Sequence, residues 1–138
     1  MTGTIKTEVA IAGGGLVGLT LGIALAQAGI GVVVVDQLPP ATVLEPQFDG
    51  RASAIAFASR RMFSALGFDS GLEGVVQPIT EILVSDGDLL NGAAPFFLHF
   101  DHSEIGSAPL GEMIENRHTR FALHSAAART PGLMLIAP

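Results

Sequence analysis

The chain has 138 residues, of which 49% are hydrophobic and 14% are charged, so its composition is that of a globular domain and excludes a disordered segment. Acidic residues outnumber basic ones 13 to 7, and the net charge of −6 argues against binding to a nucleic-acid backbone. The absence of Cys excludes a disulfide framework, a thiolate nucleophile and a Cys-based metal centre.

The segment Val9–Val35 contains no Asp, Glu, Lys or Arg, as a membrane-spanning helix would. Its composition nevertheless changes along its length, from a short apolar run at 9–12 to a Leu- and Ala-rich run at 16–28 and four valines at 32–35. Seven glycines, three of them consecutive, would weaken a single spanning helix. The pattern predicts a strand, a glycine turn, a helix and a second strand, which is a βαβ unit of a parallel sheet.

The glycine turn at residues 13–18 reads Gly-Gly-Gly-Leu-Val-Gly and fits the G-x-G-x-x-G pattern of dinucleotide-binding folds. Gly13 permits the tight turn, Gly15 lets a pyrophosphate approach the backbone, and Gly18 lets the helix pack close to the strand. Free N–H groups at the helix start would face that phosphate. Gly22 removes bulk on the helix face that we expect to cross the sheet. The cofactor-binding residues predicted in this turn are Gly13, Gly14, Gly15, Leu16, Val17 and Gly18.

Asp36 ends the second predicted strand, about 20 residues beyond the glycine turn, where dinucleotide-binding folds carry an acid. Its carboxylate can accept hydrogen bonds from the hydroxyls of an adenosine ribose and would repel a 2′-phosphate. No Arg follows at 37–39, which argues against NADP as the nucleotide bound here. We count Gln37 with the cofactor-binding residues. The alternative interpretation is that the glycines only make a tight turn and that Asp36 is a solvated strand end.

Residues 37–52 hold three Pro and one Gly without periodicity, which predicts a long loop. A helix is predicted to begin at Ser53, as its N-cap, and to stop at Gly67. Its apolar positions recur at helical spacing and leave Arg60 and Arg61 facing solvent.

Arg51 stands at the entrance of this predicted helix, on a loop that leaves the nucleotide-binding edge of the sheet. One interpretation is a cation that faces the pyrophosphate. The other is an arginine that pairs with Asp49 or lies in solvent, and position alone does not decide between them.

The second half of the chain predicts an antiparallel pair of strands at 79–85 and 95–100, separate from the parallel sheet. Asp86-Gly87 is a turn signal after the first of them. Residues 101–111 read as a loop.

Asn116 can cap a helix that runs to about Arg129, and residues 133–136 then supply the third strand of the parallel sheet. The predicted fold is α/β, with a Rossmann-like βαβ unit, a parallel sheet and an inserted antiparallel strand pair. We treat residues 1–138 as one domain and 78–115 as the insertion within it.

No metal site is predicted from the four histidines. His99 and His102 have Asp101 and Glu104 nearby, but residues three apart on a strand face opposite sides. The Gly-x-Ser-x-Gly motif of serine hydrolases does not occur, and no catalytic residue is assigned.

The glycine turn, Gly22 and Asp36 together resemble the FAD-binding start of flavoprotein monooxygenases related to p-hydroxybenzoate hydroxylase. Other segments look like the ubiquinone-biosynthesis hydroxylases among them, of the type of 2-polyprenyl-6-methoxyphenol hydroxylase. These segments are Asp49-Gly50-Arg51-Ala52-Ser53-Ala54-Ile55, Gln77-Pro78-Ile79, Val84-Ser85-Asp86-Gly87, Leu98-His99-Phe100-Asp101 and Ile114-Glu115-Asn116-Arg117.

The resemblance implies that the glycine turn holds the FAD pyrophosphate and that Asp36 binds the adenosine ribose, where the family more often has Glu. Arg51 would match the family arginine that contacts FAD, and Arg117 a polar position that faces the cofactor. The implied activity is NAD(P)H- and O₂-dependent hydroxylation of a polyprenyl phenol. The implied location is the cytoplasm, with peripheral contact to the inner membrane. Because such enzymes are much longer, we expect the chain to be their N-terminal part and inactive by itself.

Two alternatives remain open at this point. The spacing of Asp36 fits an NAD-binding dehydrogenase domain equally well, although the long loop, Arg51 and the inserted strands favour a flavoprotein. The chain could also be an interaction module that binds no nucleotide, since an incomplete sheet leaves apolar surface exposed.

Overall fold

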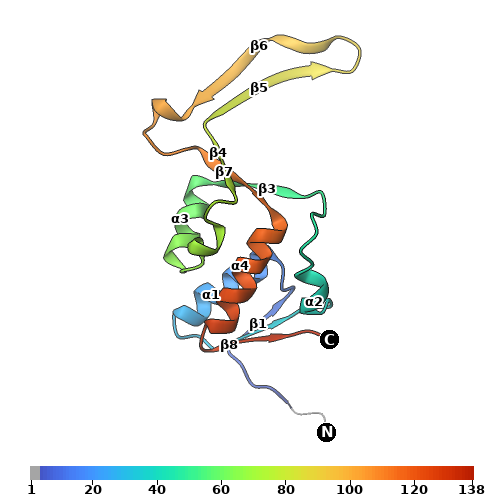
Figure 1. The fold of residues 1–138 in the computed structure, drawn as a ribbon, viewed down its shortest axis with the longest axis vertical. Helices are drawn as coiled ribbons and strands as arrows, with labels where there is room; N and C mark the ends of the chain where they lie inside the picture. Colours follow the sequence, from blue (N-terminus) through green and yellow to red (C-terminus); the bar gives the residue numbers. More distant parts are fainter. Residues whose placement is uncertain (1–3) are drawn as a thin grey trace.

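The structure of the chain is a computed structural model that describes residues 4–138. A three-stranded parallel sheet carries two long helices, and a three-stranded antiparallel sheet lies beyond them (Figure 1). A two-stranded hairpin extends away from both (Figure 1). The expected α/β class, with a βαβ unit, a parallel sheet and an inserted antiparallel strand pair, is confirmed.

The parallel sheet has the order β1-β2-β8 and is formed by β1 (Val9–Ala12), β2 (Val32–Val35) and β8 (Leu133–Ile136). All three strands lie where the sequence predicts them. Three of the four valines of the central strand are buried, which accounts for its purely β-branched composition. Among the described residues, no helix has the length and apolar character needed to cross a bilayer.

Helices α1 (Leu16–Gln27) and α4 (Asn116–Arg129) pack against each other and against the parallel sheet. Their most deeply buried core residues are Leu19, Ile23 and Leu123. Gly22 lies where α1 crosses the sheet, and a Cβ there would meet Val34 at 3.0 Å and Leu133 at 3.1 Å. The missing side chain therefore permits this close approach.

The antiparallel sheet has the order β3-β7-β4 and is formed by β3 (Ala52–Ala56), β7 (Gly111–Glu115) and β4 (Val76–Ile79). It corrects two predictions. The helix expected from Ser53 begins only at Phe57, as α3 (Phe57–Ala65), and the chain before it is β3. No strand was predicted after the loop at 101–111, but residues 111–115 pair with β3 and β4 as β7.

Ser53 and Asn116, both expected as helix caps, bond to each other instead. The Ser53 hydroxyl donates to the Asn116 side-chain oxygen at 2.6 Å, which joins the start of β3 to the first residue of α4. The backbone of Glu115 takes the N-cap position of α4. A partner distant in sequence thus overrides the local helix signal at Ser53.

Arg60 is not in solvent, as the sequence predicts, but in an ion-pair cluster. Its guanidinium contacts Glu112 on β7 and Asp69 at the start of the 3₁₀ helix η1 (Asp69–Leu72). Its side chain is only 16% exposed, so the cluster ties α3 to the sheet beside it. Arg61, the neighbouring cation, is exposed as expected.

The hairpin is formed by β5 (Glu81–Asp88) and β6 (Gly92–Asp101). The antiparallel pairing confirms the prediction, but both strands differ from the expected bounds and Ile79 belongs to β4. The turn is at 89–91 rather than at Asp86-Gly87, which lie within β5 beside an irregularity in the register. Asp88 fixes that turn because its Oδ1 accepts the N–H groups of Leu90 and Asn91, each at 2.8 Å.

The remaining elements are a one-turn helix α2 (Pro40–Val43) and a 3₁₀ turn η2 (His102–Glu104). The helix interrupts the loop that the sequence predicts over residues 37–52. The loop between α2 and β3 then approaches α4, and this approach shapes the candidate site.

Candidate nucleotide-binding site

The candidate site lies at the carboxyl ends of β1 and β2, where the glycine turn meets Asp36. The backbone N–H of Gly14 donates to Asp36 Oδ2 at 2.5 Å, and that of Leu38 donates to Oδ1 at 2.8 Å. The hydrogen bond from Leu38, followed by that from Gly14, holds the pKa of Asp36 below its ordinary value. The carboxylate therefore stays ionised, and each oxygen keeps a lone pair for a further donor.

A glycine stands at each of these positions of the turn for a different geometric reason. Gly13 has φ +105°, a backbone conformation that side chains with a Cβ rarely adopt. A Cβ on Gly18 would stand 1.9 Å from the Gly13 carbonyl oxygen, so α1 could not pack at this distance with any larger residue. A Cβ on Gly15 would meet no protein atom within 4 Å. The fold itself therefore does not require a glycine at position 15, and the predicted close approach of a pyrophosphate would account for it.

Helix α1 begins directly at this turn, with Gly15 as its N-cap and no side-chain cap. The N–H groups of its first turn are those that a helix leaves without an internal partner. Leu16 packs toward the core, whereas Val17 is 83% exposed. The predicted binding of the cofactor by Leu16 and Val17 would accordingly use their backbone N–H groups and not their side chains.

A cavity of about 490 Å³ opens beside the turn. It is bounded by Gly14, Gly15 and Asp36, which follow the carboxyl ends of β1 and β2, by residues 42–51, and by Arg120 of α4. A larger concavity of about 560 Å³ lies at the amino ends of the same strands, around residues 5–8. Because open parallel sheets bind ligands at the carboxyl ends of their strands, the smaller cavity is the candidate site.

Arg51 pairs with Asp49, as one of the two interpretations holds, and it also lines this cavity, while its contact with a pyrophosphate stays a prediction. Its Nη2 and Nε lie 2.7 Å and 3.0 Å from Asp49 Oδ2. The guanidinium of Arg51, together with that of Arg120, lowers the pKa of Asp49 to about 2. Arg51 is itself 68% exposed, so its guanidinium remains accessible to an anion.

Arg120 is a cavity residue that sequence reasoning missed. It lies on α4, its Nη2 donates to Asp49 Oδ2 at 3.0 Å, and its side chain is 15% exposed. The available signal was its position one helical turn after Arg117, which places both cations on one side of α4.

Arg117, predicted to bind the cofactor, lies beside the cavity rather than on its wall. Its Nε donates to Glu115 at 2.6 Å, its Nη1 donates to the Pro46 carbonyl at 2.9 Å, and its guanidinium lies 5.8 Å from the Phe48 ring centre. These contacts fasten the loop before β3 to α4. The predicted residue Gln37 is exposed and does not line the cavity either.

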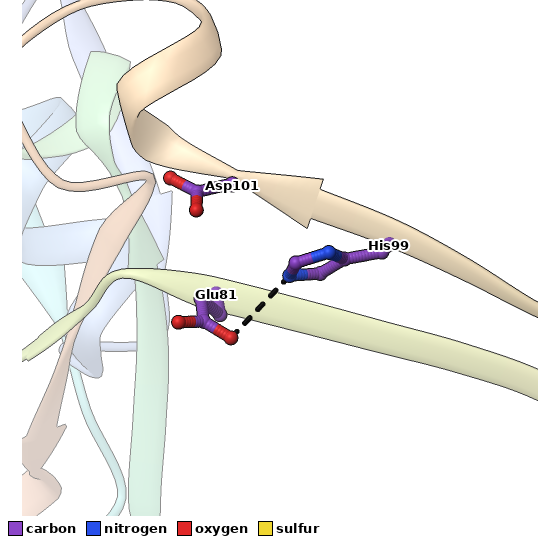
Figure 2. A group of neighbouring side chains, drawn as sticks. All are labelled: Glu81, His99 and Asp101. Carbon is purple, nitrogen blue, oxygen red and sulfur yellow. Dashed lines mark ion pairs between the residues drawn. The ribbon is translucent and has the colours of Figure 1, made fainter.

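A second cluster of chemically active side chains lies at the base of the hairpin (Figure 2). Glu81 comes from β5, whereas His99 and Asp101 come from β6, and their candidate ligand atoms lie within 4.8 Å of one another. His99 Nε2 is 3.3 Å from a Glu81 carboxylate oxygen, and Asp101 accepts the Ser103 N–H at 2.7 Å. We interpret the group as a cross-strand ion pair beside a turn-capping carboxylate, because Asp101 is already engaged and the other two side chains are half-exposed.

Comparison with known proteins places these features in a family. The sequence profile described as the FAD-binding domain matches residues 6–130. Ubiquinone hydroxylase UbiL of Rhodospirillum rubrum is 44% identical over 95% of this chain and 29% of its own length. The 3-demethoxyubiquinol 3-hydroxylase of Escherichia coli is 33% identical over 96% of this chain and 33% of its own length. The chain thus spans about a third of the curated relatives that it matches.

Solved structures share the fold at low sequence identity. A variant of PqsL from Pseudomonas aeruginosa superposes with a TM-score of 0.68 at 22% identity, over 95% of this chain and 33% of that one. The p-nitrophenol 4-monooxygenase PnpA of Pseudomonas putida superposes with a TM-score of 0.67 at 17% identity, over 99% of this chain and 32% of that one. With the family profile covering most of the sequence, the chain belongs to the FAD-binding domain family.

Proposed function

We propose that the chain holds the adenosine and diphosphate part of FAD in an NAD(P)H- and O₂-dependent hydroxylase that acts on a polyprenyl phenol in ubiquinone biosynthesis. The family membership and the names of the two relatives that are 44% and 33% identical support this proposal. The single observation that carries it is the bonded pair of Gly14 and Asp36 at the mouth of a cavity that Arg51 also lines.

Each part of the cofactor would meet a chemically suited group of this chain. Asp36 would accept hydrogen bonds from the ribose hydroxyls with its ionised carboxylate. The diphosphate would lie against Gly15 and the first-turn N–H groups of α1, where a Cβ is absent and the helix dipole is favourable. Arg51 would provide an exposed positive charge from the loop before β3.

Bound FAD would supply the redox chemistry of the reaction. The chain's own residues would anchor and orient the nucleotide end of the cofactor. Arg117 would act indirectly, because it fastens Pro46 and Phe48 to α4 and thereby holds the cavity wall in place.

The NAD-binding dehydrogenase and the nucleotide-free interaction module are not favoured, since the family match is to an FAD-binding domain. We further propose a cytoplasmic location with peripheral contact to the inner membrane, because a polyprenyl substrate partitions into lipid.

The test is flavin retention, measured as the visible absorbance of the purified protein after addition of FAD and removal of the excess. The wild-type protein should retain flavin bands, and Gly15→Ala should lose them because the added Cβ would occupy the place of the diphosphate. Gly31→Ala is the matched control, because it adds a Cβ at the other end of the strands, where its nearest neighbour would be at 3.4 Å. Equal retention by wild type and Gly15→Ala would contradict the proposal.

A further inference from the structure

Asp49 joins two arginines that reach the candidate cavity from different elements. Its Oδ2 accepts hydrogen bonds from Arg51 at 2.7 Å and from Arg120 at 3.0 Å. Arg51 comes from the loop before β3, and Arg120 comes from α4. One carboxylate oxygen therefore serves two guanidinium groups, whereas a guanidinium fork is suited to two acceptor oxygens of its own.

Arg120 has hydrogen-bonding capacity that its surroundings leave unused. Its Nε is buried and has no hydrogen-bond partner among the described residues. A buried donor without an acceptor is costly, and the side chain is only 15% exposed. The buried Nε is closed to solvent, but Arg120 lines the cavity, and only its Nη2 has an acceptor within residues 4–138, so the outer edge of the guanidinium is placed to donate to an oxygen-rich anion there.

The charges around the cavity show why Asp49 matters for such an anion. The charged lining residues are Asp36, Glu45 and Asp49 on the acidic side and Arg51 and Arg120 on the basic side. Acids outnumber bases, so the lining as a whole does not attract a diphosphate. The pKa of Asp49, lowered to about 2 by the hydrogen bonds from the arginines, keeps this carboxylate charged at physiological pH.

We propose that Arg120 is a second anion-binding residue of the cavity, and that the Asp49 carboxylate competes with the diphosphate of the nucleotide for both arginines. The proposal rests on the proposed function, since it takes the cavity as the nucleotide site. Asp49 acts as an internal substitute for a phosphate: it holds Arg51 and Arg120 together and, by the same contacts, limits the affinity of the site.

The test uses the flavin-stripped protein at its natural length, with ADP and adenosine titrated by calorimetry. Asp49→Asn should bind ADP about threefold to tenfold more tightly, because an exposed carboxylate no longer competes for the guanidinium groups. Its affinity for adenosine should not change, since adenosine lacks the diphosphate. Arg120→Gln should weaken ADP binding about tenfold and abolish the gain in the double variant.

Glu45→Gln is the matched control, because it removes the same charge from the same cavity without contact to either arginine among the described residues. Because Glu45 contacts neither arginine within the described part of the chain, its removal should raise ADP affinity less than Asp49→Asn does. Arg120→Lys keeps the charge without the planar fork and should fall between wild type and Arg120→Gln. Thermal unfolding of each variant verifies that it is folded.

Three results would overturn the inference while leaving the nucleotide site intact. Weaker ADP binding by Asp49→Asn would show that the carboxylate orients the arginines instead of competing. Equal gains in ADP affinity from Asp49→Asn and Glu45→Gln would show that the gain comes only from the change in net charge of the cavity. Unchanged ADP binding by both Arg120 variants would remove that residue from the site. A wild-type protein that binds neither ADP nor adenosine would instead refute the proposed function itself.

Discussion

The backbone N–H of Gly14 donates a 2.5 Å hydrogen bond to the Asp36 carboxylate, which joins the glycine turn to the end of the central strand. The turn leaves little room for a side chain at Gly14, since a Cβ there would lie 3.2 Å from Asp36 Oδ2 and 3.3 Å from Leu135. The residue that is proposed to bind the ribose is therefore also the residue that fixes the glycine turn in place.

We expect Asp36→Asn to lower FAD affinity by about tenfold or more, because a neutral amide accepts weaker hydrogen bonds than a carboxylate. The flavin-stripped variant should be titrated with FAD by fluorescence quenching. Because the pKa of Asp36 lies below its ordinary value, wild-type affinity should stay constant as the pH falls from 8 to 5. Wild-type affinity for FAD in Asp36→Asn would show that the carboxylate does not contact the ribose.

Gly18→Ala should destabilise the fold by about 3 kcal/mol, because its Cβ would stand 1.9 Å from the Gly13 carbonyl and α1 would have to move away from β1. Gly15→Ala serves as the control and should change the free energy of unfolding by less than about 1 kcal/mol. Urea denaturation of both variants measures the difference. Equal stability of the two would mean that the helix is not held as closely as described.

Arg60→Met should cost about 2 kcal/mol of stability, because it removes the guanidinium from Glu112 and Asp69 while keeping a similar apolar stem. Arg61→Met alters an exposed neighbour on the same helix and should stay within about 0.5 kcal/mol. Chemical denaturation should show a difference between the two that shrinks in 1 M salt. Identical denaturation midpoints of the two variants would show that the ion pairs of Arg60 do not stabilise the fold.

Because of the buried His124, we expect the folded chain to lose stability on mild acidification. Burial lowers its pKa below the ordinary 6.5, against an opposing effect of Asp36. A histidine with a depressed folded-state pKa takes up its proton more readily in the unfolded chain, so stability is complete above pH 6.5 and falls as the pH drops below it. The melting temperature of His124→Gln should therefore change less between pH 7 and 5 than that of the wild type. Parallel pH profiles of the two proteins would contradict this.

The sequence predicts the parallel sheet and its two long helices because their signals are local. A run of valines, three glycines in a row and the Pro131-Gly132 stop each determine a boundary without reference to distant residues. Gly14 bonds to Asp36, and Gly15 lines the same cavity, because consecutive parallel strands end at one edge of the sheet.

The second sheet was missed because its signals are not local. Residues 52–56 are mostly alanine and suit either a helix or a strand, and only the pairing with β7 decides in favour of the strand. The ion pairs of Arg60 and Arg120 likewise reach residues far away in the sequence, Glu112 and Asp49 respectively. Spacing along one element carries no information about such partners.

The position of β8 has a consequence for how the chain acquires its fold. Val32–Val35 is the middle strand of its sheet, yet its second neighbour is made only when synthesis has reached residues 133–136. Until then a purely aliphatic strand has an unpaired edge, which is a template for pairing with other nascent chains. Contacts at such sequence separation also slow folding. We expect refolding of this domain to be limited by the docking of β8, and its yield to fall as the protein concentration rises.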